Sequence, residues 1–130
     1  MTKRPDPVDP YGRLPRDELV QLERLMRVVD RFREIDGAFP ASYMMAFLLV
    51  AHKPGGGPTD YAPALGTIPP IASRMLLEIG EHARRGGDGY GLIERTTNPE
   101  DLRAVSLRLT RKGRELWARI SRDLGDIGHA

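Results

Sequence analysis

Cysteine is absent from this chain of 130 residues. Its absence excludes disulfide bonds, thiolate metal sites and thiol redox sensing. Long apolar runs are also missing, since the longest, residues 44–51, falls far short of the roughly 20 residues that span a bilayer. Residues 1–15 are proline-rich and charged and lack the apolar core of a signal peptide. We therefore expect a cytoplasmic protein with no membrane segment.

Lysine is scarce: of the 20 Lys and Arg residues, only Lys3, Lys53 and Lys112 are lysines. The chain has 18 acidic residues, Asp and Glu together. Arginine forks match phosphate oxygens and guanine edges. The arginine bias therefore suits nucleic-acid binding, although a high-GC genome would produce the same bias. The length favours one domain, and an apolar fraction of 40% is that of an ordinary globular protein.

Signatures of catalysis are missing too. The chain has no cysteine nucleophile and no histidine beside a Ser–Asp pair in a recognisable motif, so we do not expect an enzyme. His52, His82 and His129 lie far apart and lack the i, i+4 spacing of a helical metal site. The glycine run 55–57 lacks the Lys-Ser/Thr that follows a phosphate-binding loop, and we interpret it as a linker. No metal and no cofactor is predicted.

Helical periodicity dominates the first two thirds of the chain. Residues 1–15 are predicted to form a flexible N-terminal extension, and residues 16–130 a single domain. A helix is predicted over residues 16–37, between Pro15 and Gly37. Its wide apolar stripe needs a partner surface, which either the domain core or a second subunit would supply. The stripe consists of Leu19, Leu22, Met26, Val29 and Phe32.

Three more helices are predicted before residue 90. A buried helix spans residues 40–52, and a short one spans residues 59–65, with Thr59 as its N-cap and Gly66 at its end. The next helix is predicted to begin at a Thr67 cap, to carry prolines in its first turn and to end near Arg85. Four of its residues are expected to face the core: Ile71, Met75, Leu76 and Ile79.

The hydrophobic period then changes from helical to alternating. Residues 92–97 form one predicted strand, and Val105, Leu107 and Leu109 mark a second, half-buried strand. The turn-forming cluster 98–101 joins the strands into a hairpin, and Thr110 caps a last helix over residues 110–127. Two helices joined by a tight turn and followed by a hairpin are typical of a winged helix-turn-helix, an α+β fold that is mostly helical. We expect a wing of two or three strands over residues 92–109.

Several motifs in the second half resemble the MarR-type transcriptional regulators. Gly91-Leu92-Ile93 is similar to the family's Gly-Leu-hydrophobic strand, Asp101-x-Arg103 to its wing tip, and Leu109-Thr110-x-x-Gly113 to its last-helix start. The resemblance implies dimerisation helices at residues 16–37 and 110–127 and a DNA-binding lobe at residues 59–109. It also implies a homodimer that binds double-stranded DNA at a pseudo-palindromic site and acts as a repressor. A small aromatic effector between the lobe and the dimer helices is a further implication.

The resemblance assigns candidate DNA-binding residues one by one. Arg103 would enter the minor groove or contact phosphate, and Asp101 would orient the wing. Ser73 and Arg74 lie where the family's recognition helix has a similar pair, and Thr67 would cap that helix more readily than it would read DNA. The general basic character of the second half adds two weaker candidates, Arg95 and Arg111.

Three departures from the family's pattern leave a second interpretation of the function open. Leu102 stands where an arginine is common, Ile68, Pro70 and Ile71 occupy recognition positions that are usually small and polar, and residues 80–89 form an insertion or a longer recognition helix. Isoleucine and proline cannot hydrogen-bond base edges, though they can touch thymine methyl groups. The alternative is a winged-helix adaptor that binds a protein partner through this apolar surface.

Overall fold

The computed structural model describes residues 10–81, 87–98 and 100–125, with residues 98 and 101–103 described by their backbone alone. These residues form five helices and a two-stranded antiparallel sheet, as the winged-helix pattern predicts. No helix among them has the length and apolarity that crossing a membrane requires. The elements are α1 (Arg16–Arg33), α2 (Ala41–His52), α3 (Pro58–Leu65), α4 (Pro69–Ile79), β1 (Ile93–Asn98), β2 (Asp101–Leu109) and α5 (Arg111–Leu124).

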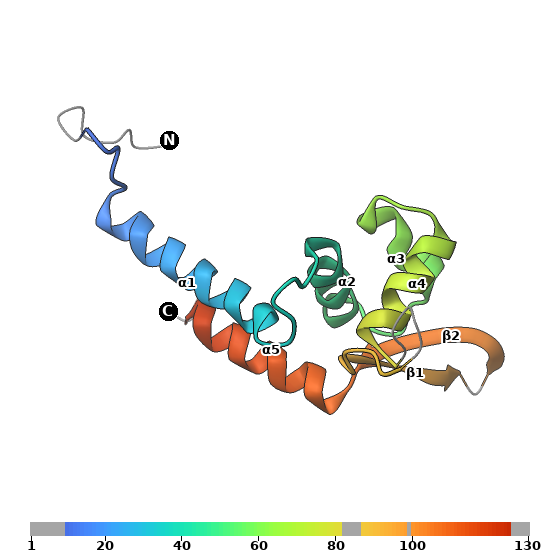
Figure 1. The fold of residues 1–130 in the computed structure, drawn as a ribbon. Helices are drawn as coiled ribbons and strands as arrows, with labels where there is room; N and C mark the ends of the chain where they lie inside the picture. The colour runs from blue at the N-terminus through green and yellow to red at the C-terminus, as the bar shows by residue number, and fades with distance from the viewer. Residues whose placement is uncertain (1–9, 82–86, 99, 126–130) are drawn as a thin grey trace.

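Helices α1 and α5 run antiparallel, side by side, and project from the rest of the molecule (Figure 1). We call this pair the arm, and residues 41–109, from α2 to β2, the lobe. Arg31 joins the two helices of the arm through two hydrogen bonds to the Asp123 carboxylate, Nε–Oδ2 of 2.7 Å and Nη2–Oδ1 of 3.1 Å. These bonds raise the pKa of Arg31 and lower the pKa of Asp123. The amino-terminal half of α1 extends beyond the end of α5 (Figure 1).

The core lies where the arm meets the lobe. Phe32, the one buried residue of α1, packs edge-on against Phe47 of α2, with ring centroids 5.9 Å apart, and against Phe39 at 5.3 Å. Aromatic pairs of this geometry add to the free energy of burying the rings. The largest fully buried side chains come from α1, α2, α4, α5 and the segment that enters the wing: Phe32, Phe47, Val50, Ile79, Leu92, Ile93 and Ile120.

Several predicted boundaries are wrong by one turn or less. Helix α1 ends at Arg33 rather than at Gly37. Helix α3 begins at Pro58, not after a Thr59 cap, because the Asp60 carboxylate accepts the Gly57 N–H at 2.8 Å and so caps the first turn. The predicted Thr110 cap is confirmed, since the hydroxyl of Thr110 accepts the Gly113 N–H at 3.0 Å.

Helix α4 differs more from its prediction. It ends at Ile79 instead of near Arg85, so residues 80–89 do not extend it in the part of that segment that the structure describes. Its N-cap is Ile68 rather than Thr67, and no side chain caps it. Ile71, predicted to face the core, is 45% exposed, and Ala72 is buried in its place, together with Leu76 and Ile79. The predictions for Leu76 and Ile79 are therefore confirmed, and the prediction for Ile71 is wrong.

Candidate nucleic-acid interface

A tight turn sets the direction of α4. Gly66 ends α3 with a φ of 68° and a ψ of 32°, in the left-handed region that glycine adopts without strain. The N–H groups of Gly66 and Thr67 bond the carbonyls of Pro63 and Ala62, each at 3.1 Å. Tyr61 fixes the other end of α3, because its buried hydroxyl donates to the Lys53 carbonyl at 2.6 Å. Burial raises the pKa of Tyr61. The sequence therefore holds α4 rigidly against α3.

The wing lies beside α4. In the antiparallel register of the hairpin, Ile93 pairs with Leu109 and Arg95 with Leu107. Since alternate residues of a strand share one face, Ile93, Arg95 and Leu107 all face α4. Ile93 and Leu107 are buried there, and Val105, nearer the tip, is 36% exposed. The predicted alternation is thus confirmed, and it places a charged residue on an otherwise apolar face.

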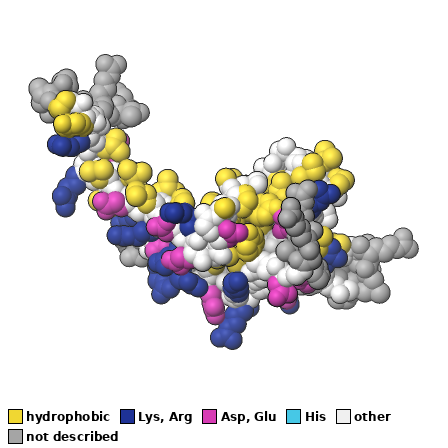
Figure 2. Space-filling model, viewed as in Figure 1, with side chains coloured by type: hydrophobic (Ala, Val, Ile, Leu, Met, Phe, Trp, Pro, Cys, Tyr) yellow, Lys and Arg dark blue, Asp and Glu magenta, His cyan; other side chains and the backbone are white. Residues whose placement is uncertain are grey.

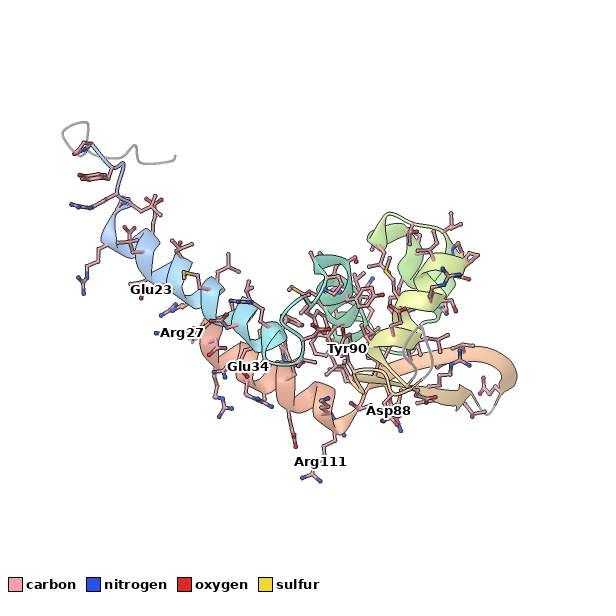
Figure 3. All side chains as sticks on the ribbon, viewed as in Figure 1. Glu23, Arg27, Glu34, Asp88, Tyr90 and Arg111 are labelled. Carbon is pink, nitrogen blue, oxygen red and sulfur yellow. The ribbon has the colours of Figure 1, made fainter. Side chains whose placement is uncertain are left out.

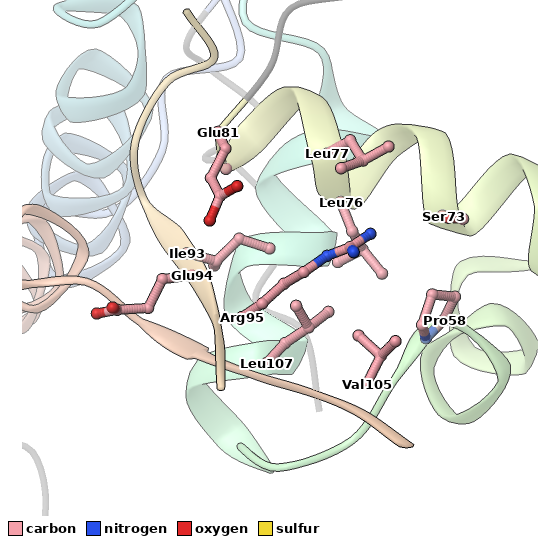
Figure 4. Close-up of a pocket in the computed structure, with 11 residues that line it drawn as sticks. Pro58, Ser73, Leu76, Leu77, Glu81, Ile93, Glu94, Arg95, Val105 and Leu107 are labelled. Atoms are coloured by element: carbon pink, nitrogen blue, oxygen red, sulfur yellow. The ribbon is translucent and has the colours of Figure 1, made fainter. Parts of the chain in front are cut away.

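A shallow groove separates α4 from the wing (Figure 4). Ser73 and Leu76 line it from α4, and Ile93, Arg95 and Leu107 line it from the strands. The Arg95 side chain reaches from β1 across the groove toward α4 (Figure 4). The enclosed space is only about 20 Å³, enough for one water molecule. A filled surface of this kind can contact another macromolecule but cannot enclose a small substrate.

Two guanidinium groups at this surface have no acidic partner in the described part of the chain. Arg74 is exposed on α4 and Arg95 is exposed on β1, and neither forms an ion pair or hydrogen bond with any residue that the structure describes. By contrast, Arg108 on the opposite face of the hairpin lies 3.7 Å from the carboxylate of Glu94. A cation without a carboxylate partner is available to a phosphate or a base edge. The structure thus brings Ser73 and Arg95 together in one groove, and Arg74 is the exposed residue that follows Ser73 on α4.

The remaining candidates lie elsewhere. The side chains of Asp101 and Arg103 are outside the described residues, although the backbone of both belongs to β2. Thr67 lies in the turn before α4 and does not cap it. Arg111 projects away from α3 and α4 at the start of α5 (Figure 3) and pairs with Glu115 at 3.3 Å. Arg111 is therefore not part of the groove.

One positioning contact has no signature in the sequence. Tyr90, just before the wing, donates a hydrogen bond of 2.5 Å to the carboxylate of Asp36, which lies between α1 and α2. This bond lowers the pKa of Asp36, and the Asp36 carboxylate raises the pKa of Tyr90 to about 12. The Tyr90 ring also stacks on Phe39, with centroids 4.9 Å apart. These contacts fix the base of the wing relative to the arm, yet the two residues lie 54 positions apart in the chain.

The described residues contain no group of three His, Cys, Asp or Glu side chains that could bind a metal ion. No protein-family model matches the chain, and no curated protein matches it in sequence. Solved structures do match. The transcriptional repressor CouR, bound to a 23-mer DNA duplex, is 30% identical over 86% of this chain and 79% of its own, with a TM-score of 0.52.

Two further matches agree in fold. A MarR family transcription regulator is 27% identical over 82% of this chain and 68% of its own, with a TM-score of 0.53. MepR of S. aureus, in complex with DNA, is 18% identical over 82% of this chain and 80% of its own, with a TM-score of 0.59. The wing and last-helix motifs, the observed order of elements and these matches all agree. The chain is a divergent member of the MarR family of winged helix-turn-helix transcriptional regulators.

Proposed function

We propose that this protein binds double-stranded DNA as a homodimer and regulates transcription, as a repressor that occludes a promoter. The observation that carries the proposal is the pair Arg74 and Arg95, exposed on α4 and on the wing and free of acidic partners among the described residues. Both CouR and MepR, which share this fold, are in complexes with DNA. A helix flanked by a hairpin fits the major groove, with the wing on the adjoining backbone.

The exposed apolar face of the arm is the observation that favours a dimer. Apolar residues of α1 follow one edge of the helix and stay open to solvent in a single chain (Figure 2): Leu19, Leu22, Leu25, Met26 and Val29, between 37% and 58% exposed. Leu25 and Met26 are the most exposed of them, at 56% and 58%. An apolar stripe of this length is typical of a subunit interface. A second copy would cover it and place two α4 helices in successive major grooves, about 34–36 Å apart.

The direct test is DNA affinity across a salt series, measured for random duplex DNA and for the DNA upstream of the protein's own gene. Tight binding to the upstream DNA, with a steep fall in affinity as salt rises, is expected because phosphate contacts release counterions. Arg74→Ala and Arg103→Ala should each weaken binding about tenfold, with Arg108→Ala, on the opposite face of the hairpin, as the matched control. Equal and weak binding to both duplexes would overturn the proposal.

We also propose that a small aromatic anion regulates the protein from a cavity between the arm and the base of the wing. The cavity has a volume of about 230 Å³ and an apolar floor that includes Leu92 and Leu116. Lys112 and Arg119 supply positive charge at its rim, where Arg119 lies 3.9 Å from the carboxylate of Glu34. Benzoate is a suitable probe, and it should raise the Tm of the wild type but not of Arg119→Gln. An unchanged Tm of the wild type at millimolar benzoate would contradict this part of the proposal.

A second candidate, a protein-binding adaptor, is favoured by the exposed isoleucines of α4. Ile68 and Ile71 are 58% and 45% exposed. Arg74→Ala and Ile71→Asp separate the two functions. If DNA affinity is indifferent to Arg74→Ala while Ile71→Asp abolishes binding to a protein partner, the adaptor function is correct.

A further inference from the structure

The amino-terminal tip of α4, residues 68–71, consists of Ile68, Pro69, Pro70 and Ile71, and all four are exposed. Folding normally hides such side chains, yet both isoleucines keep about half of their surface open to solvent. The tip lies at the end of α4 that follows the tight turn, one helical turn before Arg74 (Figure 1). The proposed function places α4 in the major groove of DNA. The part of α4 that begins the helix is therefore apolar on the surface that would face the DNA.

The first turn of α4, Pro69 to Ile71, offers no free backbone hydrogen-bond donor to a ligand. Pro69 and Pro70 have no N–H group. The N–H groups of Ile71 and Ala72 both donate to the Ile68 carbonyl at 3.0 Å, and that of Thr67 donates to Ala62. The free amides with which a helix amino terminus usually binds a phosphate are missing from the first turn of α4. This tip cannot bind the DNA backbone as an ordinary recognition helix does.

Only one group at base edges in the major groove matches an apolar contact, the C5-methyl of thymine. We propose that the Ile68–Ile71 tip reads thymine methyl groups, so that this protein selects its site by apolar contacts at the tip and by Arg74 one turn further along. The inference rests on the proposed DNA binding and specifies how a half-site is recognised. It assigns the specificity of the tip to Ile68 and Ile71, the two isoleucines that the fold leaves exposed there.

The test begins with selection of tight-binding duplexes from a random-sequence pool by the full-length wild-type protein. Each thymine of the selected half-site is then replaced by deoxyuridine, which removes the methyl group and leaves every hydrogen-bonding group in place. We expect one or two positions per half-site at which the replacement lowers affinity about fourfold, the effect of losing one buried CH₂. Replacements outside the contacted positions should change affinity less than twofold.

A double-mutant cycle links the methyl group to a side chain. Ile71→Ala or Ile68→Ala should weaken binding to the thymine duplex and abolish the difference between thymine and deoxyuridine at the contacted position. Both isoleucines are exposed, so the variants should keep the Tm of the wild type. Met45→Ala is the matched control, because Met45 is 48% exposed on α2, away from the groove, and its loss should leave the thymine effect intact.

The outcomes separate this inference from the proposed function. If no duplex is enriched over random DNA, both fall together. If a duplex is enriched and bound tightly, but deoxyuridine at every half-site position leaves its affinity unchanged, the inference alone is overturned. Unchanged affinity of Ile71→Asp for the selected duplex would also overturn it, and would leave the tip as a surface for a protein partner.

Discussion

The arm and the lobe differ in how far they bury their apolar side chains. In the lobe, the 12 residues of α2 bury Ala46, Phe47 and Val50 completely. In the arm, the 18 residues of α1 bury Phe32 alone and leave a row of leucines and a methionine in solvent. Helix α2 is apolar on nearly every side and α1 only along one face, yet that difference in composition does not explain why the apolar face of α1 lies open. The lobe and the buried residues of the arm complete one core, whereas the arm also has an apolar face that the described residues of a single chain leave open.

This difference separates two kinds of information in the sequence. Apolar residues of the lobe specify the fold of one chain, while under the proposed function those of the α1 face specify an association between chains. Substitutions in the lobe should therefore change the stability of the fold, and substitutions on the open face should change the oligomeric state. The four predictions below test that separation, from the largest expected effect to the smallest.

Leu25→Glu should have the largest effect. It places a charge at the centre of the open α1 face, and burying an unpaired charge in an interface costs about 3 kcal/mol or more, or a hundredfold and above in the dimer dissociation constant. Sedimentation should show a monomer, and DNA affinity should fall with it. Arg27→Gln, which makes the same change in charge on the polar face of α1, should remain dimeric. A dimeric Leu25→Glu variant would refute the assignment of this face.

Gly113→Ala should destabilise the lobe at its junction with α5. A Cβ at this position would overlap the carbonyl oxygen of Leu92, which belongs to the backbone and cannot move aside. We expect a loss of about 3 kcal/mol in the free energy of unfolding, even though alanine favours a helix over glycine by about 1 kcal/mol. Gly37→Ala is the control, because a Cβ there meets nothing within 4 Å. Urea denaturation would measure both, and equal stability of the two variants would contradict the account.

The predictability of the fold follows the same division. The order of elements was predictable because periods of 3.6 and 2 residues report burial within one chain, as the alternation at Val105, Leu107 and Leu109 does. The end of α4 was not predictable, because the carbonyls of Glu78, Ile79 and Gly80 accept N–H groups of residues 90–92, a contact that no local pattern reports. The Thr67 cap was wrong because two prolines fix the backbone of the first turn and shift the start of the helix by one residue.

The candidate site was partly predictable. Ser73 followed from the family resemblance and Arg95 from charge alone, yet both line the same groove. Arg111 carried the same sequence signal as Arg95 but lies apart from the groove, since charge alone does not specify which face of the fold a residue occupies. Tyr90 and Asp36 were missed because their contact is a tertiary one between distant segments.

Tyr90→Phe should lower the Tm by a few degrees at neutral pH, since it removes the hydrogen bond to Asp36 and leaves the ring stacked on Phe39. The difference from wild type should shrink in acid, because a carboxyl with a lowered pKa contributes stability that is lost as pH falls through its folded-state pKa. It should also shrink between about pH 10, the ordinary pKa of tyrosine, and about 12, the raised pKa of Tyr90. A constant difference across the pH range would show that the bond does not stabilise the fold.

Arg111→Ala should have the smallest effect, on both DNA affinity and stability. Its side chain is 90% exposed and pairs with Glu115, one turn along α5, and surface pairs of this spacing contribute about 0.5 kcal/mol or less. Arg95→Ala, in the groove, should instead reduce DNA affinity about tenfold and reduce the salt dependence by about one phosphate contact. Fluorescence anisotropy at several salt concentrations would compare them. An equal loss of DNA affinity in the two variants would show that the DNA-contacting surface includes the start of α5.

The mass of the complex with a selected duplex of about 20–25 base pairs, long enough for two half-sites one helical turn apart, tests the central claim most directly. The claim is that the open face of α1 joins two copies so that two α4 helices bind one site. Native mass spectrometry should find two chains on each duplex for the wild type and none at the same concentration for Leu25→Glu. One chain on each duplex, with the same affinity in both proteins, would contradict the account.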